Sequence, residues 1–273
     1  MNTIPSVQFN NGKQIPQVGL GLWQVKDASE LETSVVEAAK AGYRHFDSAQ
    51  IYGNEATLAQ ALTKTGLKRE ELFITTKISV FNFASFKTKK SFEISLKKLN
   101  TDHVDLLLLH FPLTALRGRA WRDLEDIHAE GKATSIGVSN YTIRHLKSLL
   151  KECKVRPAVN QVELHVFLQQ PELLAYCKQE GIAVEAYSPL AHGRGLDDPV
   201  LAAIAKKHAK SPAQIMLRWC IEVGTVPLPK SVTPARIQQN LNIFDFKLDK
   251  EDMEQIKKLD KGMRTCWDPT LVP

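Results

Sequence analysis

Residues 104–109, with the sequence Val-Asp-Leu-Leu-Leu-Leu, decide the fold class of this chain. Five of the six residues are apolar, and they do not alternate with polar ones. Such a run is typical of a strand in a parallel sheet whose two faces are both covered by helices. Helical patterns lie on both sides of this run in the sequence, at residues 86–99 and 143–153. The centre of the chain therefore predicts an α/β protein.

The same alternation of strand-like runs and helical patterns extends over the rest of the chain. The eight strand candidates are Val18–Leu20, Arg44–Asp47, Leu72–Thr76, Val104–Leu109, Ala133–Val138, Ala158–Gln161, Ala183–Ala186 and Thr225–Leu228. Clear helical patterns include Leu31–Ala41, Glu55–Thr65, Phe86–Leu99 and Ile143–Cys153. Eight strand–helix units with short connections predict either a closed barrel or a long doubly wound sheet.

The first strand favours the barrel. A doubly wound sheet that binds a dinucleotide carries Gly-x-Gly-x-x-Gly after its first strand, whereas Gly19-Leu-Gly21 lacks the third glycine. The length of 273 residues is close to the roughly 250 residues of a typical (β/α)8 barrel. We therefore predict an α/β fold of the (β/α)8 TIM-barrel type, with residues 1–273 as a single domain.

Three segments lie outside the eight units. The turn pair Asn11-Gly12, between Val7–Phe9 and Gln14-Ile15, predicts an N-terminal β-hairpin that plugs one end of the barrel. Two extra helical stretches are expected at Pro199–His208 and Lys250–Leu259.

Composition narrows the function classes. Apolar residues make up 43% and charged residues 24%, as in ordinary globular proteins. The net charge of +6 comes from Lys and Arg scattered through amphipathic segments, which indicates a basic cleft for an anionic cofactor rather than a nucleic-acid surface. The four cysteines are widely spaced without a Cys-x-x-Cys pair, which favours reduced thiols over a metal site. No apolar run approaches the roughly 20 residues that span a bilayer, so we expect a cytoplasmic protein with no membrane partner.

Four titratable side chains fall at or just beyond the carboxyl ends of three consecutive strand candidates. Asp47 ends the second strand and Tyr52 follows it, Lys77 ends the third strand, and His110 ends the fourth. In (β/α)8 barrels this edge of the sheet holds the active site. We therefore expect the four side chains to converge.

This set of side chains has the chemistry that carbonyl reduction needs. A carbonyl that accepts a hydride develops alkoxide charge and requires a proton donor. Tyrosine has an ordinary pKa of about 10, and a nearby ammonium lowers it while a carboxylate holds the ammonium in place. A histidine can orient the carbonyl oxygen. A surface tyrosine, a rim salt bridge and a structural histidine are the alternative readings, and the coincidence of all four residues favours the functional one.

The segments around these residues resemble the aldo-keto reductase family. Gly42–Glu55 resembles the family signature that contains the Asp and Tyr, and Phe73–Lys77 and Asp105–Pro112 resemble the segments with the Lys and His. The likeness continues through Ile136–Asn140, Asn160–His165, Tyr187–Leu190 and Pro229–Thr233. It implies an NADP-dependent oxidoreductase that reduces carbonyls with Tyr52 as general acid. Lys77 and Asp47 would tune that acid, and His110 would orient the substrate.

The resemblance also implies an NADPH site. Ser139, Asn140 and Gln161 would bind the nicotinamide carboxamide, and Tyr187 would stack on the ring, with core packing as its alternative role. Lys230 and Arg236 would bind the 2′-phosphate. The full set of expected cofactor-binding residues is Gly21, Leu22, Ser139, Asn140, Gln161, Tyr187, Ser188, Leu190, Lys230, Ser231, Val232, Thr233, Arg236, Gln239 and Asn240. Gln239 stands where the family usually has Glu facing the adenine, and we expect it to keep a hydrogen-bond acceptor there.

The departures from the family concern the substrate. Phe111 and Ser79 stand where tryptophans are common, and the connection Leu113–Arg119 replaces a longer loop. These features are most similar to the bacterial 2,5-diketo-D-gluconate reductase branch and imply an open pocket for aldehydes, dicarbonyls and keto sugars. The expected substrate-binding residues are Trp23, Tyr52, His110, Phe111 and Trp267. Plain packing is an equal alternative for Trp267.

Two other function classes stay open at this point. Some proteins of this fold bind NADPH as regulatory or structural subunits with little turnover, and a nucleic-acid-binding role is a distant third reading. His165 has no ligand partners at metal-binding spacing, which favours a structural role. We expect a monomer, without a metal, that acts on a small-molecule substrate.

Overall fold

The computed structural model describes residues 4–83, 87–113 and 116–273. Eight parallel strands lie side by side in chain order, and consecutive strands are paired throughout. They are β3 (Gly19–Gly21), β4 (His45–Asp47), β5 (Phe73–Ile78), β6 (Val104–Leu109), β7 (Ala133–Ser139), β8 (Val159–Glu163), β9 (Ala183–Tyr187) and β10 (Val226–Leu228). The N–H of Gly21 donates to the carbonyl of Pro229 (3.0 Å), which brings the first strand to the segment after the last. The sheet is a nearly closed barrel, and the predicted (β/α)8 fold is confirmed.

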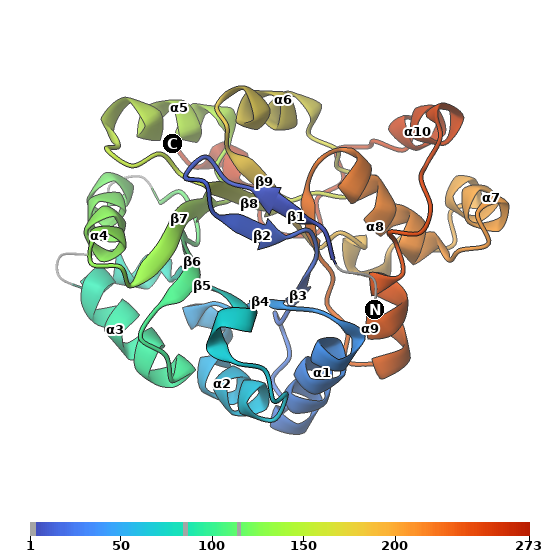
Figure 1. Cartoon of the computed structure of the whole chain (residues 1–273). Helices are drawn as coiled ribbons and strands as arrows, with labels where there is room; N and C mark the ends of the chain where they lie inside the picture. The colour runs from blue at the N-terminus through green and yellow to red at the C-terminus, as the bar shows by residue number, and fades with distance from the viewer. Residues whose placement is uncertain (1–3, 84–86, 114–115) are drawn as a thin grey trace.

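Helices surround this barrel (Figure 1). The eight that follow the strands are α1 (Ala28–Ala41), α2 (Glu55–Thr63), α3 (Lys87–Leu99), α4 (Arg117–Ala129), α5 (Ile143–Glu152), α6 (Pro171–Gln179), α8 (Pro212–Glu222) and α9 (Pro234–Leu241). The two predicted extra helices are α7 (Pro199–Lys207) and α10 (Lys250–Lys257), on the side of α8 in Figure 1. In the part of the chain that the structure describes, none of the helices has the length and apolar character that crossing a membrane requires.

Local sequence signals explain where several helices begin and end. The Asp27 side chain accepts a hydrogen bond from the N–H of Glu30 at the start of α1, and Gly42 ends this helix with a φ of 117°. At the start of helix α8 the side chains of Ser211 and Gln214 each accept a hydrogen bond from the other residue's backbone N–H. Pro212 occupies the first helical position, where no backbone N–H is needed. These helices therefore start and stop at residues that satisfy their free backbone groups.

The N-terminal hairpin seals one end of the barrel, as predicted. Strands β1 (Ser6–Gln8) and β2 (Gln14–Pro16) pair across the turn at Gly12, and they lie over the barrel end in Figure 1. Ile15 is fully buried there, in an apolar cluster that includes Phe73, Leu106 and Leu108. Apolar packing thus fills the amino end of the barrel, and the polar residues of the interior lie nearer the other end.

Several strands run further than the sequence indicated. Strand β5 continues to Ile78 because Lys77 and Ile78 pair with Leu108 and Leu109 of β6. Lys77 therefore lies within its strand rather than closing it. Conversely, α4 already begins at Arg117, so the last part of the predicted loop Leu113–Arg119 is helical. Two residues of that loop, 114 and 115, and Phe86 of the predicted third helix lie outside the described residues.

Candidate active site

Asp47, Tyr52 and Lys77 form a connected chain of polar groups at the carboxyl end of the barrel. The Lys77 ammonium, fully buried, donates to Asp47 Oδ1 (2.5 Å), to the Ser48 carbonyl (3.1 Å) and to the Tyr52 hydroxyl (3.2 Å). Tyr52 reaches this position because a short 3₁₀ turn, η1 (Gln50–Tyr52), follows β4 directly. The predicted convergence of these three residues is thus present in the structure.

Burial and charge act in opposite directions on this chain. Burial raises the pKa of Tyr52, and the nearby Lys77 ammonium only partly counteracts it. The expected effect of Lys77 on Tyr52 is present, but desolvation is larger, so the pKa of Tyr52 is not lowered overall. Burial acts to lower the pKa of Lys77, but Asp47 and Tyr52 outweigh it and raise the pKa. At neutral pH the phenol is protonated and the amine is charged.

His110 lies beside the phenol. Its ring centroid is 5.6 Å from that of Tyr52, and the two rings are nearly perpendicular. Burial and the positive charge of Lys77 lower the pKa of His110 to about 3. The imidazole is consequently neutral at physiological pH and can take part in a hydrogen bond with a neutral carbonyl oxygen.

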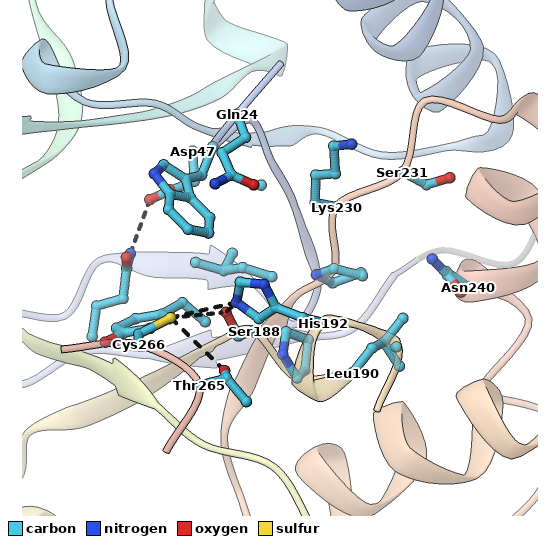
Figure 2. A pocket seen from close by; sticks show the side chains of 18 of the residues that line it. Gln24, Asp47, Ser188, Leu190, His192, Lys230, Ser231, Asn240, Thr265 and Cys266 are labelled. Carbon is cyan, nitrogen blue, oxygen red and sulfur yellow. Dashed lines mark hydrogen bonds between the residues drawn. The ribbon is translucent and has the colours of Figure 1, made fainter. Parts of the chain in front are cut away.

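These residues lie at one end of a cavity of about 900 Å³. Figure 2 shows Asp47 and Cys266 on one side of it and Lys230, Ser231 and Asn240 on the other. Tyr52 and His110 line the cavity, as do Trp23, Phe111 and Trp267 and every expected cofactor-binding residue except Leu22. Leu22 is fully buried, and its backbone bonds to Asp47 and Asn54 instead. The expected contact of Leu22 with the cofactor therefore stays a prediction.

Amide and hydroxyl groups line the middle of the cavity. Tyr187 donates its hydroxyl hydrogen to Asn140 Oδ1 (2.7 Å), and Asn140 Nδ2 donates to the His110 carbonyl (3.0 Å). Gln161 Nε2 donates to Asp47 Oδ2 (2.9 Å). The Tyr187 hydroxyl thus holds its ring beside the Asn140 amide, and Gln161 lines the same cavity.

The far end of the cavity is cationic. Lys230 and Arg236 are exposed, and no ion pair involves either of them within the described residues. Between them, Ser231 Oγ accepts from the N–H of Thr233 at the start of α9. Two free cations beside a helix N-terminus make this end suitable for a phosphate group.

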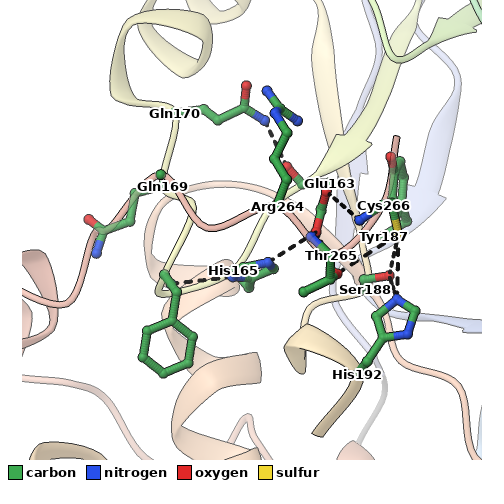
Figure 3. Close-up of polar contacts among 12 residues, drawn as sticks. Glu163, His165, Gln169, Gln170, Tyr187, Ser188, His192, Arg264, Thr265 and Cys266 are labelled. Atoms are coloured by element: carbon green, nitrogen blue, oxygen red, sulfur yellow. Dashed lines mark hydrogen bonds and ion pairs between the residues drawn. The ribbon is translucent and has the colours of Figure 1, made fainter. Parts of the chain in front are cut away.

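The C-terminal strap, residues 264–268, forms one wall of the cavity. The buried carboxylate of Glu163, at the end of β8, accepts from the N–H and hydroxyl of Thr265 (both 2.6 Å) and from the N–H of Cys266 (3.2 Å). Figure 3 shows these bonds converging on Glu163. His165 is also fully buried. Its Nε2 lies 3.3 Å from Oε1 of the same carboxylate, and its Nδ1 accepts from the N–H of Phe167. Its expected structural role is consistent with these contacts.

The aromatic wall residues differ in exposure. Trp267 is 76% exposed and Trp23 41% exposed, and the Trp267 ring meets that of Phe111 edge-on at 6.2 Å. Ser79 is buried at the cavity wall. The pocket is therefore open on the side where Trp267 lies.

Sequence reasoning did not single out Glu163, Cys266 or Thr265, nor Gln24, which also lines the cavity. It left the loop at His192 without a defined role. His192 Nε2 lies 3.1 Å from Ser188 Oγ and 3.4 Å from Cys266 Sγ, and the His192 ring contacts Trp23 edge-on at 5.5 Å. The loop thus crosses the cavity between two walls. No local signal identifies these contacts, because their partners are as much as 103 residues apart.

The chain is similar to known proteins of one family. The sequence profile described as "Aldo/keto reductase family" matches residues 17–261. Among curated proteins, a glyoxal reductase of Bacillus subtilis is 44% identical over 264 residues, covering 97% of this chain and 96% of its own. The methylglyoxal reductase DkgA of Escherichia coli K12 is 42% identical over 267 residues, 96% of each chain. A Bombyx mori aldo-keto reductase solved in complex with NADP superposes with a TM-score of 0.92 at 36% identity, covering 97% of this chain and 95% of its own.

Proposed function

The chain belongs to the aldo/keto reductase family, and from this premise we propose that it catalyses the NADPH-dependent reduction of small aldehydes and dicarbonyls. The observation that carries the proposal is the buried Asp47–Lys77–Tyr52 chain, whose phenol lies beside His110 at the end of a long cavity. A scaffold that only bound a nucleotide would have no need of a buried ammonium behind a tyrosine.

In this proposal Tyr52 is the general acid. NADPH, when bound, would supply the hydride that the carbonyl carbon accepts. His110, neutral because of its low pKa, donates a hydrogen bond to the carbonyl oxygen and orients it. As negative charge develops on that oxygen, the Tyr52 hydroxyl transfers its proton to it. Lys77 then stabilises the phenolate, and Asp47 keeps Lys77 charged and in place.

The residues present fit the proposed cofactor. The cavity joins the catalytic groups to the cations Lys230 and Arg236, so one extended ligand could contact both ends. Cationic groups near a helix N-terminus suit the 2′-phosphate that distinguishes NADPH from NADH. Two hydrogen-bonding amides, Asn140 and Gln161, suit a carboxamide beside Tyr187.

We propose 2-oxoaldehydes as the substrate class. The relatives named as glyoxal and methylglyoxal reductases act on such compounds, and the exposed Trp267 side of the pocket leaves room for varied substituents. An open pocket buries little apolar area, at about 25 cal/mol per Å². We therefore propose broad specificity, with KM toward the upper end of the usual range of about 1 μM–1 mM. We further propose that residues 1–273 form a single barrel domain and that the protein is a monomer in the cytoplasm.

A spectrophotometric assay tests the proposal directly. NADPH oxidation is followed with methylglyoxal, a keto sugar acid and an aromatic aldehyde, with NADH as the comparison cofactor. The proposal requires turnover with several of these carbonyls and a clear preference for NADPH. NADPH binding without turnover of any carbonyl would instead support a regulatory or structural subunit.

A further inference from the structure

A second layer of buried polar groups lies directly beneath the catalytic residues. Gln161 Nε2 donates to Asp47 Oδ2 and to Glu185 Oε2, each at 2.9 Å. A side-chain amide nitrogen carries two hydrogens, and these two carboxyl groups accept both of them. The carbonyl oxygen Oε1 is then the group that Gln161 presents to the cavity it lines.

Glu185 lies among buried side chains of the neighbouring strands. It is fully buried on β9, and its second oxygen, Oε1, lies 3.6 Å from Nε2 of His45 on β4. His45 in turn bonds to Thr75 Oγ1 (3.0 Å). A Cβ on Gly19 would lie 2.3 Å from Nδ1 of His45, so only glycine leaves room for this ring. The pair is thus a built feature of the barrel interior.

Burial, together with the charged neighbours, keeps Glu185 and His45 neutral. Asp47, Lys77 and His45 are the titratable groups that face Glu185 across the barrel. Burial and the charge of Asp47 raise the pKa of Glu185 to about 8, while burial and Lys77 lower the pKa of His45 to about 3. At neutral pH Glu185 is therefore a protonated acid, and its Oε2 accepts from Gln161.

We propose that Glu185 is a positioning residue for the nicotinamide: by accepting one hydrogen of the Gln161 amide, it keeps the Gln161 carbonyl turned toward the cavity, where it accepts from the carboxamide N–H. In a reversed amide Oε1 would face the Asp47 carboxylate, which only accepts, and Nε2 would offer the cavity a donor instead. Without Glu185 the amide nitrogen would be held by one hydrogen bond instead of two, and the amide could rotate away from Asp47. The inference rests on the proposed function, because it concerns the cofactor of that reaction.

The test separates nicotinamide binding from binding of the rest of the cofactor. The dissociation constants of NADPH and of adenosine 2′,5′-bisphosphate, which lacks the nicotinamide, are measured by calorimetry. The variants are Glu185→Leu, which removes the acceptor, and Glu185→Gln, which mimics the neutral acid and keeps an acceptor. Glu125→Leu is the matched control, because Glu125 is a buried glutamate of α4 that bonds to Trp121, Lys154 and Val155, outside the cavity.

We expect Glu185→Leu to bind NADPH about five- to tenfold more weakly, as expected for one lost hydrogen bond, and to bind the bisphosphate as the parent does. Glu185→Gln should restore the parent affinity for NADPH, and Glu125→Leu should leave the ratio of the two affinities unchanged. In a Gln161→Leu background, Glu185→Leu should add no further loss, since the two residues act through one contact.

A second readout follows the face of the nicotinamide. NADPH is labelled with deuterium on one face of the nicotinamide ring. The parent should transfer hydrogen from a single face of that ring, whereas Glu185→Leu should transfer hydrogen from both faces. If Glu185→Leu does not fold, Glu185→Asp replaces it, because it withdraws the carboxyl by one methylene. If Glu185→Leu has the same ratio of NADPH affinity to bisphosphate affinity as the parent, this inference is overturned while the proposed function stands. A parent chain that does not bind NADPH overturns the proposed function and, with it, this inference.

Discussion

Tyr52 is the residue on which the proposed chemistry depends. Its hydroxyl is 3.2 Å from the Lys77 ammonium, and its raised pKa keeps the proton in place at neutral pH. Replacing Tyr52 with Phe removes the proton donor while leaving the ring, so we expect turnover of methylglyoxal to fall on the order of 10²-fold or more. The affinity for NADPH should change little. Tyr43→Phe is the matched control, because this buried tyrosine bonds only weakly to the Ile237 carbonyl (3.4 Å). Turnover of Tyr52→Phe within a few-fold of the parent would rule out Tyr52 as the acid.

At the opposite end of the cavity, we expect Lys230 and Arg236 to determine the choice between NADPH and NADH. A hydrogen bond to a charged group contributes roughly 1.5–3 kcal/mol, and NADH has no 2′-phosphate to receive it. Replacing both residues with Ala should therefore weaken NADPH binding strongly and NADH binding little. Replacing the exposed Lys206 and Lys257, which lie outside the cavity, controls for the loss of two positive charges. Equal weakening of both cofactors in the Lys230/Arg236 variant would place the 2′-phosphate elsewhere.

At the scale of elements, strand β8 and the C-terminal strap act together. The Glu163 carboxylate accepts three hydrogen bonds from Thr265 and Cys266, and the strap carries Trp267 against Phe111. Glu163→Gln replaces one carboxylate oxygen with a donor, which cannot accept from the strap. We expect KM for aromatic aldehydes, which need this wall, to rise more than KM for methylglyoxal, with kcat changed less. Steady-state kinetics on both substrates measures the effect, with the exposed Glu152→Gln as control. A uniform change in both KM values would contradict a role of the strap in forming the wall.

The order of elements and the convergence of Asp47, Tyr52 and Lys77 could be predicted from sequence, because each rests on a local pattern. The apolar run at residues 104–109 gave the bounds of β6, and Asp47 and Tyr52 lie in a contiguous signature. Strand ends were less predictable, because pairing with the neighbouring strand, rather than composition, extends β5 to Ile78.

The layer beneath the site could not be predicted for a different physical reason. His45 and Glu185 read as ordinary polar residues near strand ends, and they meet only because the closed barrel brings together residues that are 140 positions apart in the sequence. Glu163 and Thr265 are likewise 102 residues apart. Partners of this kind require the three-dimensional arrangement of the strands.

Over the whole molecule, the barrel interior changes from apolar to polar along its axis. The hairpin end is filled by side chains such as Ile15 and Leu106, whereas the carboxyl end contains Lys77, Gln161 and Glu185, all buried. Buried polar groups are costly unless they are bonded. The pairing of Lys77 with Asp47 and of Gln161 with Glu185 limits that cost. The protonation of the buried groups therefore couples the stability of the fold to pH.

This coupling predicts the pH dependence of stability. With a folded pKa of about 8, Glu185 alone stabilises the fold most below its ordinary pKa of 4.5, and this contribution is lost as pH rises toward 8. With a folded pKa of about 3, His45 alone stabilises the fold most above its ordinary pKa of 6.5, and this contribution is lost as pH falls toward 3. Between pH 4.5 and 6.5 the pair binds one proton in both states, on Glu185 when folded and on His45 when unfolded, so the two effects cancel.

Above pH 6.5 only the folded chain keeps that proton, so stability should fall as pH rises from 6.5 toward 8. The expected loss is on the order of 1 kcal/mol in the free energy of unfolding. Below pH 6.5 stability should fall with acidification, because His110 has a folded pKa of about 3 and the unfolded chain takes up the extra proton. The free energy of unfolding in urea, measured at pH 5, 6.5 and 8, tests both the alkaline and the acidic loss of stability. The slope with pH should follow the difference in bound protons between the folded and unfolded chains. Gln at position 185 cannot ionise, so Glu185→Gln should no longer lose stability between pH 6.5 and 8 but should still lose stability on acidification. An equal loss of stability between pH 6.5 and 8 in parent and variant would mean that Glu185 is already ionised in the folded barrel.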